Sequence, residues 1–465
     1  MTMHRILKSF FLPLFLVAVA FAWGCQTNPV TGRQELRLVT PQQELQLGRD
    51  YHPSLVMMYD GEYVGDDELT RYLTAVVDRV HSVSHRREMP VSFTLLNTSV
   101  VNAFALPGHV YATRGLVVRL DSEAEFASIM AHEMGHVAAG HTAQRLTRQA
   151  LTTLALGLGG YALEDAEGIM LAGQVGIMLA GLSYSREQER QADRLAVYYM
   201  TLAGWNPEAA LEVHRMLGEL SGREETILDK YLATHPPPAE RIDYVTRMID
   251  SGELPLERVE GDGLFAGRWA DRTDNIRRVQ QAYEKYDEAA QKLRSEETEK
   301  ALALVGEAVD IQPDQAPFHR LKGDVLLRKD RLDGAETAYK RSLELYPGYS
   351  HAHIGLGKLA LASGNYAEAE SSFLEASGIY PASLAAQHGL GVARYEQEKF
   401  HEAVEPLKTV SDAVPQNPRI LFMLARSYDN SEQLAPAYET YVRAVNSGLE
   451  EPERSFALER IQALE

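Results

Sequence analysis

Residues 131–136 read AHEMGH, and this motif is the strongest signal in the first half of the chain. His132 and His136 lie four residues apart, so on a helix both imidazoles project from one face and can reach one metal ion. Glu133 directly follows the first histidine, on the side where it can accept the proton of a water molecule that attacks a carbonyl carbon. The stretch therefore predicts a metal site on a helix.

The residues before this stretch predict the helix itself. Ser122 and Glu125 have the spacing of a capping box, which satisfies free backbone N–H groups at a helix start. The apolar residues 126–130 lead from this cap to the histidines, so we expect a helix from about 122 to 139. A surface helix with two solvated histidines is the alternative, and the cap and the apolar residues argue against it.

A zinc site that catalyses hydrolysis needs a third protein ligand. His141 is nearest, but the extended pattern of three histidines has its third one at the place of Thr142. Glu189 and Asp193 lie four residues apart on a predicted helix, so Glu189 could bind zinc while Asp193 orients a liganding imidazole. Glu187 is the rival for the ligand role, and an ordinary charged helix face is the alternative for all three acids.

Together these residues resemble the M48 peptidases, a family of zinc metallopeptidases. The segment NAFALPG at 102–108 is similar to this family's segment before the active-site helix, and THPPPAER at 234–241 is similar to its downstream His-Pro segment. His109 stands where the family commonly has a second glycine. The resemblance implies a zincin-type metallopeptidase domain that is mainly α with a small β-sheet.

The resemblance also implies roles for single residues. It implies one Zn²⁺ per chain, bound by His132, His136 and Glu189. Glu133 would be the general base, and Asp193 the acid that supports a liganding imidazole. His235 is implied to lie near the metal, where it either steadies the oxyanion or occupies the open position in a resting form. Arg241 and Asn102 are implied as accessory residues.

The second half of the chain repeats every 34 residues. Proline, alanine and glycine recur in phase, at residues 313, 347, 381 and 415, at 301, 335, 369, 403 and 437, and at 323, 357 and 391. This period resembles the tetratricopeptide repeat, in which small residues let two helices approach and aromatic residues fill the gap between them. Five units starting near 282, 316, 350, 384 and 418 predict an α-solenoid with a concave face.

The N-terminus has the pattern of an export signal. Arg5 and Lys8 precede the apolar residues 10–22, a stretch of 13 that is too short to span a bilayer. Cys25, the chain's only cysteine, follows a glycine, as at a lipoprotein processing site. A plain secretory signal with an incidental cysteine is the alternative. Because Gln26 comes next and not aspartate, we expect lipidated Cys25 to anchor the chain at the outer membrane, facing the bacterial periplasm.

Length and composition fit two folded domains. The chain has 465 residues, 45% of them hydrophobic, which is too long for one ordinary core. The formal net charge of −19 argues against nucleic acid as the main partner, because phosphate binding needs a basic surface. The expected domain order is a signal peptide at 1–24, a tether at 25–40, the peptidase domain at 41–260, a linker at 261–275 and the repeats at 276–465.

Apolar periodicity gives the expected elements of the peptidase domain. Helices are predicted at residues 41–59, 67–84, 142–156, 166–182, 186–203, 207–220 and 237–250, and strands at 91–96, 110–113 and 116–118. Residues 251–275 are expected to be loop-like. The stretch 151–182 is rich in alanine, glycine, leucine and methionine, and predicts either a buried helix or a mobile lid.

Two functions follow as hypotheses. The first is a zinc endopeptidase of the bacterial cell envelope that degrades misassembled outer-membrane or periplasmic proteins, with the repeats binding protein or peptide substrates. The second is a chaperone-like or scaffold protein that acts mainly through its repeats, for which the outer-membrane β-barrel assembly machinery is the expected docking partner. The intact metal-site pattern around Glu133 favours the first hypothesis, because a scaffold does not need it.

Overall fold

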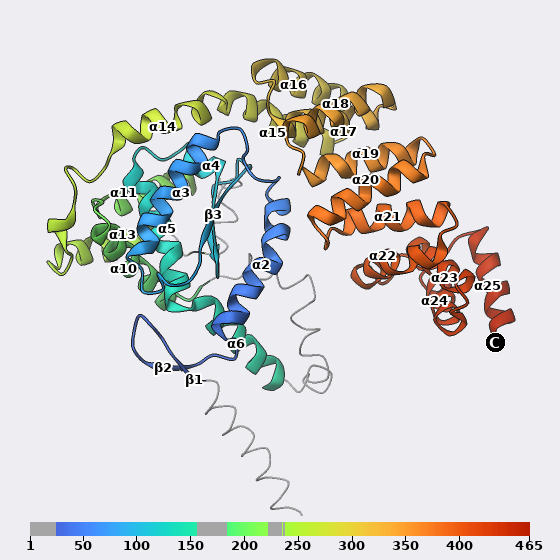
Figure 1. Ribbon diagram of the computed structural model, residues 1–465, viewed down its shortest axis with the longest axis horizontal. Helices are drawn as coiled ribbons and strands as arrows, with labels where there is room; N and C mark the ends of the chain where they lie inside the picture. Colours follow the sequence, from blue (N-terminus) through green and yellow to red (C-terminus); the bar gives the residue numbers. More distant parts are fainter. Residues whose placement is uncertain (1–24, 156–183, 222–234, 236–237) are drawn as a thin grey trace, which may run out of the picture. The chain divides into compact units, whose positions relative to one another are not determined.

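The structure is a computed structural model that describes residues 25–155, 184–221, 235 and 238–465 (Figure 1). The described chain divides into two compact units between Arg278 and Val279. The expected signal peptide, the expected helix at 166–182 and most of the expected lid lie outside the described residues. None of the helices that the structure describes has both the length and the apolar character needed to span a bilayer.

A three-stranded sheet lies at the centre of the first unit. Its strands are β3 (Ser92–Leu96), β4 (Ala103–Leu106) and β5 (His109–Thr113), in the spatial order β3-β5-β4. β5 runs parallel to β3 and antiparallel to β4. Gly108, with φ of +87°, makes the tight turn between β4 and β5. The strands predicted at 91–96 and 110–113 are confirmed, whereas the sequence did not predict β4.

The strand predicted at 116–118 is wrong. Residues Arg114–Val117 form the short helix α4 instead. The hydroxyl of Thr113 accepts a hydrogen bond from the backbone N–H of Leu116 at 3.2 Å and caps this helix. A local cap at the end of β5 therefore overrides the strand preference of the β-branched residues that follow.

Helix α5 (Glu123–Ala139) is the core element, and all of its residues are buried. Ser122 accepts a hydrogen bond from the N–H of Glu125 at 3.2 Å, so the predicted cap and helix are confirmed. The sheet, α3, α10 and α11 pack around α5. The other helices of the unit are α2 (Pro41–Met58), α3 (Asp67–Ser82), α6 (His141–Ala155), α10 (Arg186–Leu202), α11 (Ala209–Ser221), α13 (Pro238–Asp250), the 3₁₀ helix η1 (Leu256–Arg258) and α14 (Ala266–Arg278).

The predicted loop at 251–275 is wrong in its second part, because α14 begins at Ala266. Trp269 of α14 is fully buried, and its indole N–H donates to the carbonyl of Leu120 at 2.7 Å. Its ring also stacks on Phe126 of α5, with centroids 5.6 Å apart. One large aromatic residue thus ties a segment expected as a linker to the core of the first unit.

The segment expected as a tether forms a hairpin. β1 (Cys25–Thr27) pairs antiparallel with β2 (Gln34–Leu36). Val39, directly after the hairpin, is buried in the cluster that joins α2 to the sheet. The hairpin therefore belongs to the first unit.

The second unit consists of five helix pairs, and the five predicted repeats are confirmed (Figure 1). The pairs are α15 (Gln280–Arg294) with α16 (Thr298–Ile311), α17 (Ala316–Arg328) with α18 (Leu332–Leu345), α19 (Ser350–Ala362) with α20 (Tyr366–Ile379), α21 (Leu384–Glu396) with α22 (Phe400–Ala413), and α23 (Pro418–Asn430) with α24 (Leu434–Asn446), followed by α25 (Glu453–Leu464).

The small residues of the repeats allow the expected close packing. A Cβ atom on Gly323 would lie 2.6 Å from the ring of Tyr339, and one on Gly355 would lie 2.3 Å from the same ring. Phe373 is held in the same way between Gly357 and Gly389. Each ring thus fills a space that exists only because the facing helices carry glycine.

Candidate metal centre

The two histidines of the AHEMGH stretch face each other on α5. The Nε2 atoms of His132 and His136 lie 3.0 Å apart, and both side chains are buried. Gly135 lies between them on the face that meets α10, where an added Cβ would be 3.1 Å from the carbonyl oxygen of Ala192. The glycine lets α10 approach α5 closely enough to bring acidic side chains to the histidines.

Glu189 is the acid that α10 brings to this place. Its Oε1 lies 3.5 Å from His136 Nε2 and its Oε2 lies 3.6 Å from His132 Nε2. Burial by itself would raise the pKa of Glu189, but His235 and His136 hold the pKa below its usual range. Glu187, the rival for the ligand role, is exposed.

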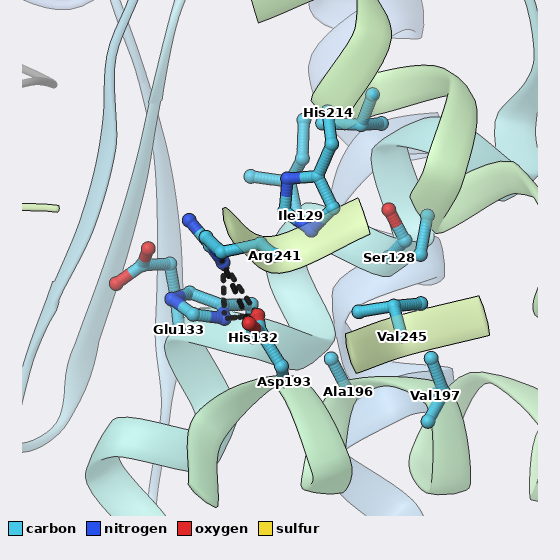
Figure 2. A pocket seen from close by; sticks show the side chains of 12 residues that line it. Ser128, Ile129, His132, Glu133, Asp193, Ala196, Val197, His214, Arg241 and Val245 are labelled. Atoms are coloured by element: carbon cyan, nitrogen blue, oxygen red, sulfur yellow. Dashed lines mark hydrogen bonds and ion pairs between the residues drawn. The ribbon is translucent and has the colours of Figure 1, made fainter. Parts of the chain in front are cut away.

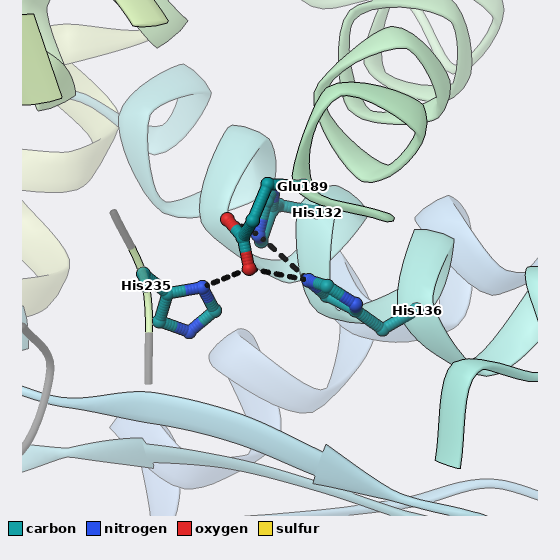
Figure 3. Close-up of side chains that lie close together, drawn as sticks. All are labelled: His132, His136, Glu189 and His235. Carbon is teal, nitrogen blue, oxygen red and sulfur yellow. Dashed lines mark hydrogen bonds and ion pairs between the residues drawn. The ribbon is translucent and has the colours of Figure 1, made fainter. Parts of the chain in front are cut away.

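His235 completes a cluster of four buried side chains (Figure 3). Its Nδ1 lies 2.9 Å from Glu189 Oε1. One ligand atom from each of His132, His136, Glu189 and His235 lies within 4.8 Å of the others. Glu189 Oε2 has no hydrogen-bond partner among the described residues although it is buried, so it leaves a lone pair for an ion. Two or three imidazoles and one carboxylate form a donor set that suits zinc.

A second layer of charged residues holds His132 (Figure 2). Asp193 Oδ1 lies 2.9 Å from His132 Nδ1, which fixes the proton on Nδ1 and leaves Nε2 free to bind a metal. Arg241 of α13 donates from Nε to Asp193 Oδ2 at 3.0 Å. Burial would raise the pKa of Asp193, but Arg241 holds it below its usual range, so the group is a carboxylate. Asp193 and Arg241 therefore lie where the sequence expected supporting residues.

Glu133 lies in the same buried site but outside the four-residue cluster. Its Oε1 has no hydrogen-bond partner within the part of the chain that the structure describes, and His235 Nε2 lies 3.7 Å from it. Burial raises the pKa of Glu133, against the opposing influence of His235. A carboxylate with a raised pKa and an unsatisfied oxygen is suited to take up a proton.

Two residues named from the sequence lie elsewhere. Asn102 donates from its side chain to the hydroxyl of Tyr59 at 3.0 Å, and its backbone N–H donates to the hydroxyl of Thr113. These contacts join the start of β4 to the core and not to the metal cluster. Cys25 is the first residue of β1.

Sequence reasoning missed the residues that support His136. The Nδ1 atoms of His136 and His141 lie 2.8 Å apart, and His141 Nε2 lies 3.0 Å from Gln191 Oε1. Burial lowers the pKa of His141 to about 4, so its ring is neutral at pH 7. The ring of Tyr184 stacks on His136 at 3.8 Å. The position of His141, five residues after His136, was a usable signal, although it was interpreted only for the role of a metal ligand.

Another histidine missed by sequence reasoning lies behind His132. His214 of α11 is buried and lines a small cavity with His132, Asp193 and Arg241 (Figure 2). Burial and the nearby Arg241 guanidinium together lower the pKa of His214 to about 3. His214 belongs to the packing behind the site, and it carries no charge at neutral pH.

Comparisons with known proteins agree with this geometry. Residues 67–249 match the model of peptidase family M48, and residues 286–350 and 326–391 match tetratricopeptide repeat models. The beta-barrel assembly-enhancing protease of Escherichia coli K12 is 26% identical over 361 residues, which cover 71% of this chain and 72% of that protein. Mitochondrial metalloendopeptidase OMA1 of Arabidopsis thaliana is 31% identical over 183 residues, 39% of this chain and 36% of that protein.

Among solved structures, YrrB, described as a tetratricopeptide repeat protein with an unusual peptide-binding site, covers 38% of this chain and 90% of its own, with a TM-score of 0.33 and 16% identity. The buried cluster is able to hold the metal ion that M48 peptidases use. The chain is thus a metalloendopeptidase that uses zinc, built from a peptidase family M48 domain and a set of tetratricopeptide repeats.

Proposed function

We propose that His132, His136 and Glu189 bind the zinc ion and that Glu133 is the general base. The observation that carries this proposal is the buried cluster of ligand atoms within 4.8 Å of one another, beside a carboxylate that stays outside the cluster. When bound, zinc supplies the Lewis acidity that peptide hydrolysis needs. Glu133 takes the proton of the attacking water and passes it to the amine that leaves. Asp193 and Arg241 keep His132 in the tautomer that binds metal.

The role of His235 has two alternatives. Its Nδ1 contacts Glu189, and its Nε2 lies 3.7 Å from Glu133 Oε1, so it lies between the third ligand and the base. It either steadies the oxyanion or occupies the open position in a resting form. His235→Ala separates the two: lower peptide turnover supports the first role, and higher turnover supports the second.

We further propose that the enzyme works in the bacterial cell envelope on misassembled outer-membrane or periplasmic proteins, and that the repeats bind these substrates or the β-barrel assembly machinery. The likeness to a protein named beta-barrel assembly-enhancing protease supports this, because it extends over 71% of the chain and so beyond the peptidase domain. The N-terminal residues 1–25 support an anchor at the outer membrane through acylated Cys25.

Two experiments test these proposals. The first compares the zinc content and the casein cleavage of the wild type with those of Glu133→Gln. We expect the variant to keep its zinc and to lose cleavage. Undiminished cleavage by Glu133→Gln would refute the proposed base. The second compares membrane fractions and the mass of the N-terminal peptide between wild type and Cys25→Ser. A soluble wild-type protein without added mass at Cys25 would contradict the anchor.

The second function, a scaffold that acts through the repeats, has one observation in its favour: the repeats form a compact unit of their own. Glu133→Gln separates this function from proteolysis, because it leaves the repeats intact. If the variant restored the assembly of outer-membrane proteins in cells that lack the protein, the scaffold function would account for the phenotype. We expect it to fail, because the buried metal cluster is complete.

A further inference from the structure

His136 lies next to a sharp corner in the chain. α5 ends at Ala139, Gly140 takes the left-handed conformation with φ of +69°, and α6 begins at His141. This corner turns His141 back onto the last turn of α5, so that its Nδ1 lies 2.8 Å from Nδ1 of His136. His141 is fully buried and is not among the four residues that can hold the metal.

The positions of the nitrogen atoms decide where the protons are. Nε2 of His136 faces His132 and Glu189, so this atom must keep its lone pair free for a metal. The proton of His136 is therefore on Nδ1 and is donated to Nδ1 of His141. The proton of His141 is then on Nε2, where Gln191 Oε1 accepts it at 3.0 Å. In both hydrogen bonds the proton is donated away from the metal site, from His136 to His141 and from His141 to Gln191. This direction selects the tautomer of His136 whose Nε2 can bind metal.

Gln191 connects this pair to the third ligand. It lies on α10, two residues after Glu189. The same helix thus provides one metal ligand and also the acceptor that fixes the ring of His141. A shift of α6 against α10 would therefore disturb the orientation of His136 through its contact with His141.

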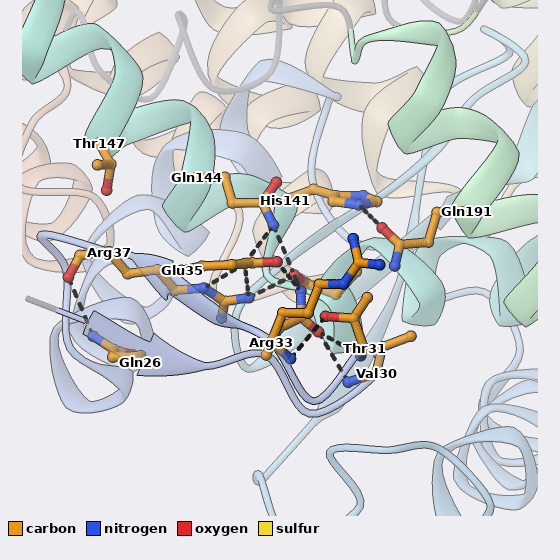
Figure 4. Close-up of polar contacts among 12 residues, drawn as sticks. Gln26, Val30, Thr31, Arg33, Glu35, Arg37, His141, Gln144, Thr147 and Gln191 are labelled. Carbon is orange, nitrogen blue, oxygen red and sulfur yellow. Dashed lines mark hydrogen bonds and ion pairs between the residues drawn. The ribbon is translucent and has the colours of Figure 1, made fainter.

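The N-terminal hairpin closes the corner from outside (Figure 4). Arg37 donates to the carbonyl of Ala139 at 2.7 Å, and Asn28 donates to the same oxygen at 3.2 Å. The Arg37 guanidinium packs on Gly140, where an added Cβ would lie 2.2 Å from it. The backbone N–H of Leu38 donates to the hydroxyl of Thr147 on α6 at 2.9 Å. The hairpin therefore contacts both helices, and its cation lies at the negative end of α5.

We propose that His141 is a positioning residue for the metal ligand His136, that Gln191 fixes the ring of His141, and that Arg37 closes the corner that brings the two histidines together. The inference rests on the proposed metal site. Replacing a residue that hydrogen-bonds to a metal ligand typically weakens metal binding by about 10- to 100-fold. We expect a change of this size when the contact between His136 and His141 is lost.

The test uses the full-length protein and two replacements of one residue. His141→Phe keeps a ring but removes the acceptor for His136, whereas His141→Asn places an oxygen close to the former Nδ1. The zinc dissociation constant is measured by competition with a chromophoric chelator, and kcat and KM are measured on a fluorogenic peptide. We expect His141→Phe to weaken zinc binding about 10- to 100-fold and His141→Asn to recover most of this loss. Zinc binding by folded His141→Phe equal to that of the wild type would overturn the proposal.

Further variants separate positioning from folding. Should His141→Phe fail to fold, Gln191→Leu gives the same test, because it releases the ring of His141 without changing the corner. Wild-type affinity in folded Gln191→Leu would then overturn the proposal. Arg37→Gln should weaken zinc binding as well, whereas Arg33→Gln on the same hairpin, where the side chain is exposed, should not. Equal effects of the two arginine variants would refute the role of Arg37. Absence of zinc from the wild type would instead refute the metal site itself.

Discussion

Replacing Arg241 tests how much the second layer of the metal site contributes to stability. Two ion pairs join the same helices, α10 and α13. Arg241 and Asp193 are both buried, with side chains 6% and 3% exposed, whereas Arg186 and Glu240 are 71% and 50% exposed. Arg241→Leu leaves the Asp193 carboxylate buried without its cation, which costs about 3–5 kcal/mol in buried pairs. Arg186→Leu breaks an exposed pair that contributes about 0–1 kcal/mol.

The difference between the two variants is large enough to measure. For a unit of this size, about 1 kcal/mol corresponds to a shift in Tm of about 2–4 °C, so Arg241→Leu should lower the Tm of the first unit by about 6–20 °C. Differential scanning calorimetry of the full-length protein, with and without zinc, measures this shift. The double variant Asp193→Asn/Arg241→Leu should be more stable than Arg241→Leu, because no buried charge remains unpaired. A Tm loss in Arg241→Leu no larger than that in Arg186→Leu would refute the reasoning.

Three further predictions concern catalysis, the repeats and pH. Glu133→Gln should lower kcat by about 10²- to 10⁴-fold, since proton transfer by a positioned group contributes this much, while zinc content stays at the wild-type level. Gly355→Ala should destabilise the repeats by about 1–3 kcal/mol in urea unfolding, because its Cβ would lie 2.3 Å from the ring of Tyr339; Gly378→Ala, where the added atom meets open space, is the matched control and should cost nothing. Folded His214 has a pKa of about 3 and the unfolded residue about 6.5, so only the unfolded chain binds a proton between these values. Wild-type stability should therefore fall as pH drops from about 6.5, by up to about 1.4 kcal/mol per pH unit from this residue, and His214→Leu should show a shallower fall in urea titrations at pH 7 and pH 5.

Local spacing made most of the fold predictable. Three features of the sequence depend only on contacts within one helix or one helix pair, and each is confirmed. They are the cap at Ser122, the two histidines four residues apart and the 34-residue period. The acid at Glu189 was predictable because an i, i+4 spacing places it on one helix face with Asp193. The resemblance was needed for His235, since a lone histidine before three prolines has no geometric signal of its own.

The missed features depend on contacts between distant parts of the chain. Arg37 acts on a carbonyl 102 residues away, and Gln191 acts on His141 50 residues away. No periodicity of the sequence reports such pairs. α14 was taken for a loop because of its glycine-rich surroundings, and its helical state is stabilised by the burial of Trp269 against α5. Tertiary packing determines these contacts and the helical state of α14, and a single sequence does not reveal such packing.

The packing of the hairpin and of α14 bears on where the protein can be cut for recombinant expression. The region matched by the M48 family model, residues 67–249, would omit α2, which contributes Leu47, Tyr51 and Leu55 to the apolar cluster beneath the sheet. It would also omit Arg37 at the Gly140 corner and Trp269 against α5. A fragment with those ends would expose apolar surface and aggregate. Residues 25–278 keep every one of these contacts, so a soluble, zinc-binding peptidase fragment should begin at the hairpin and end with the last turn of α14.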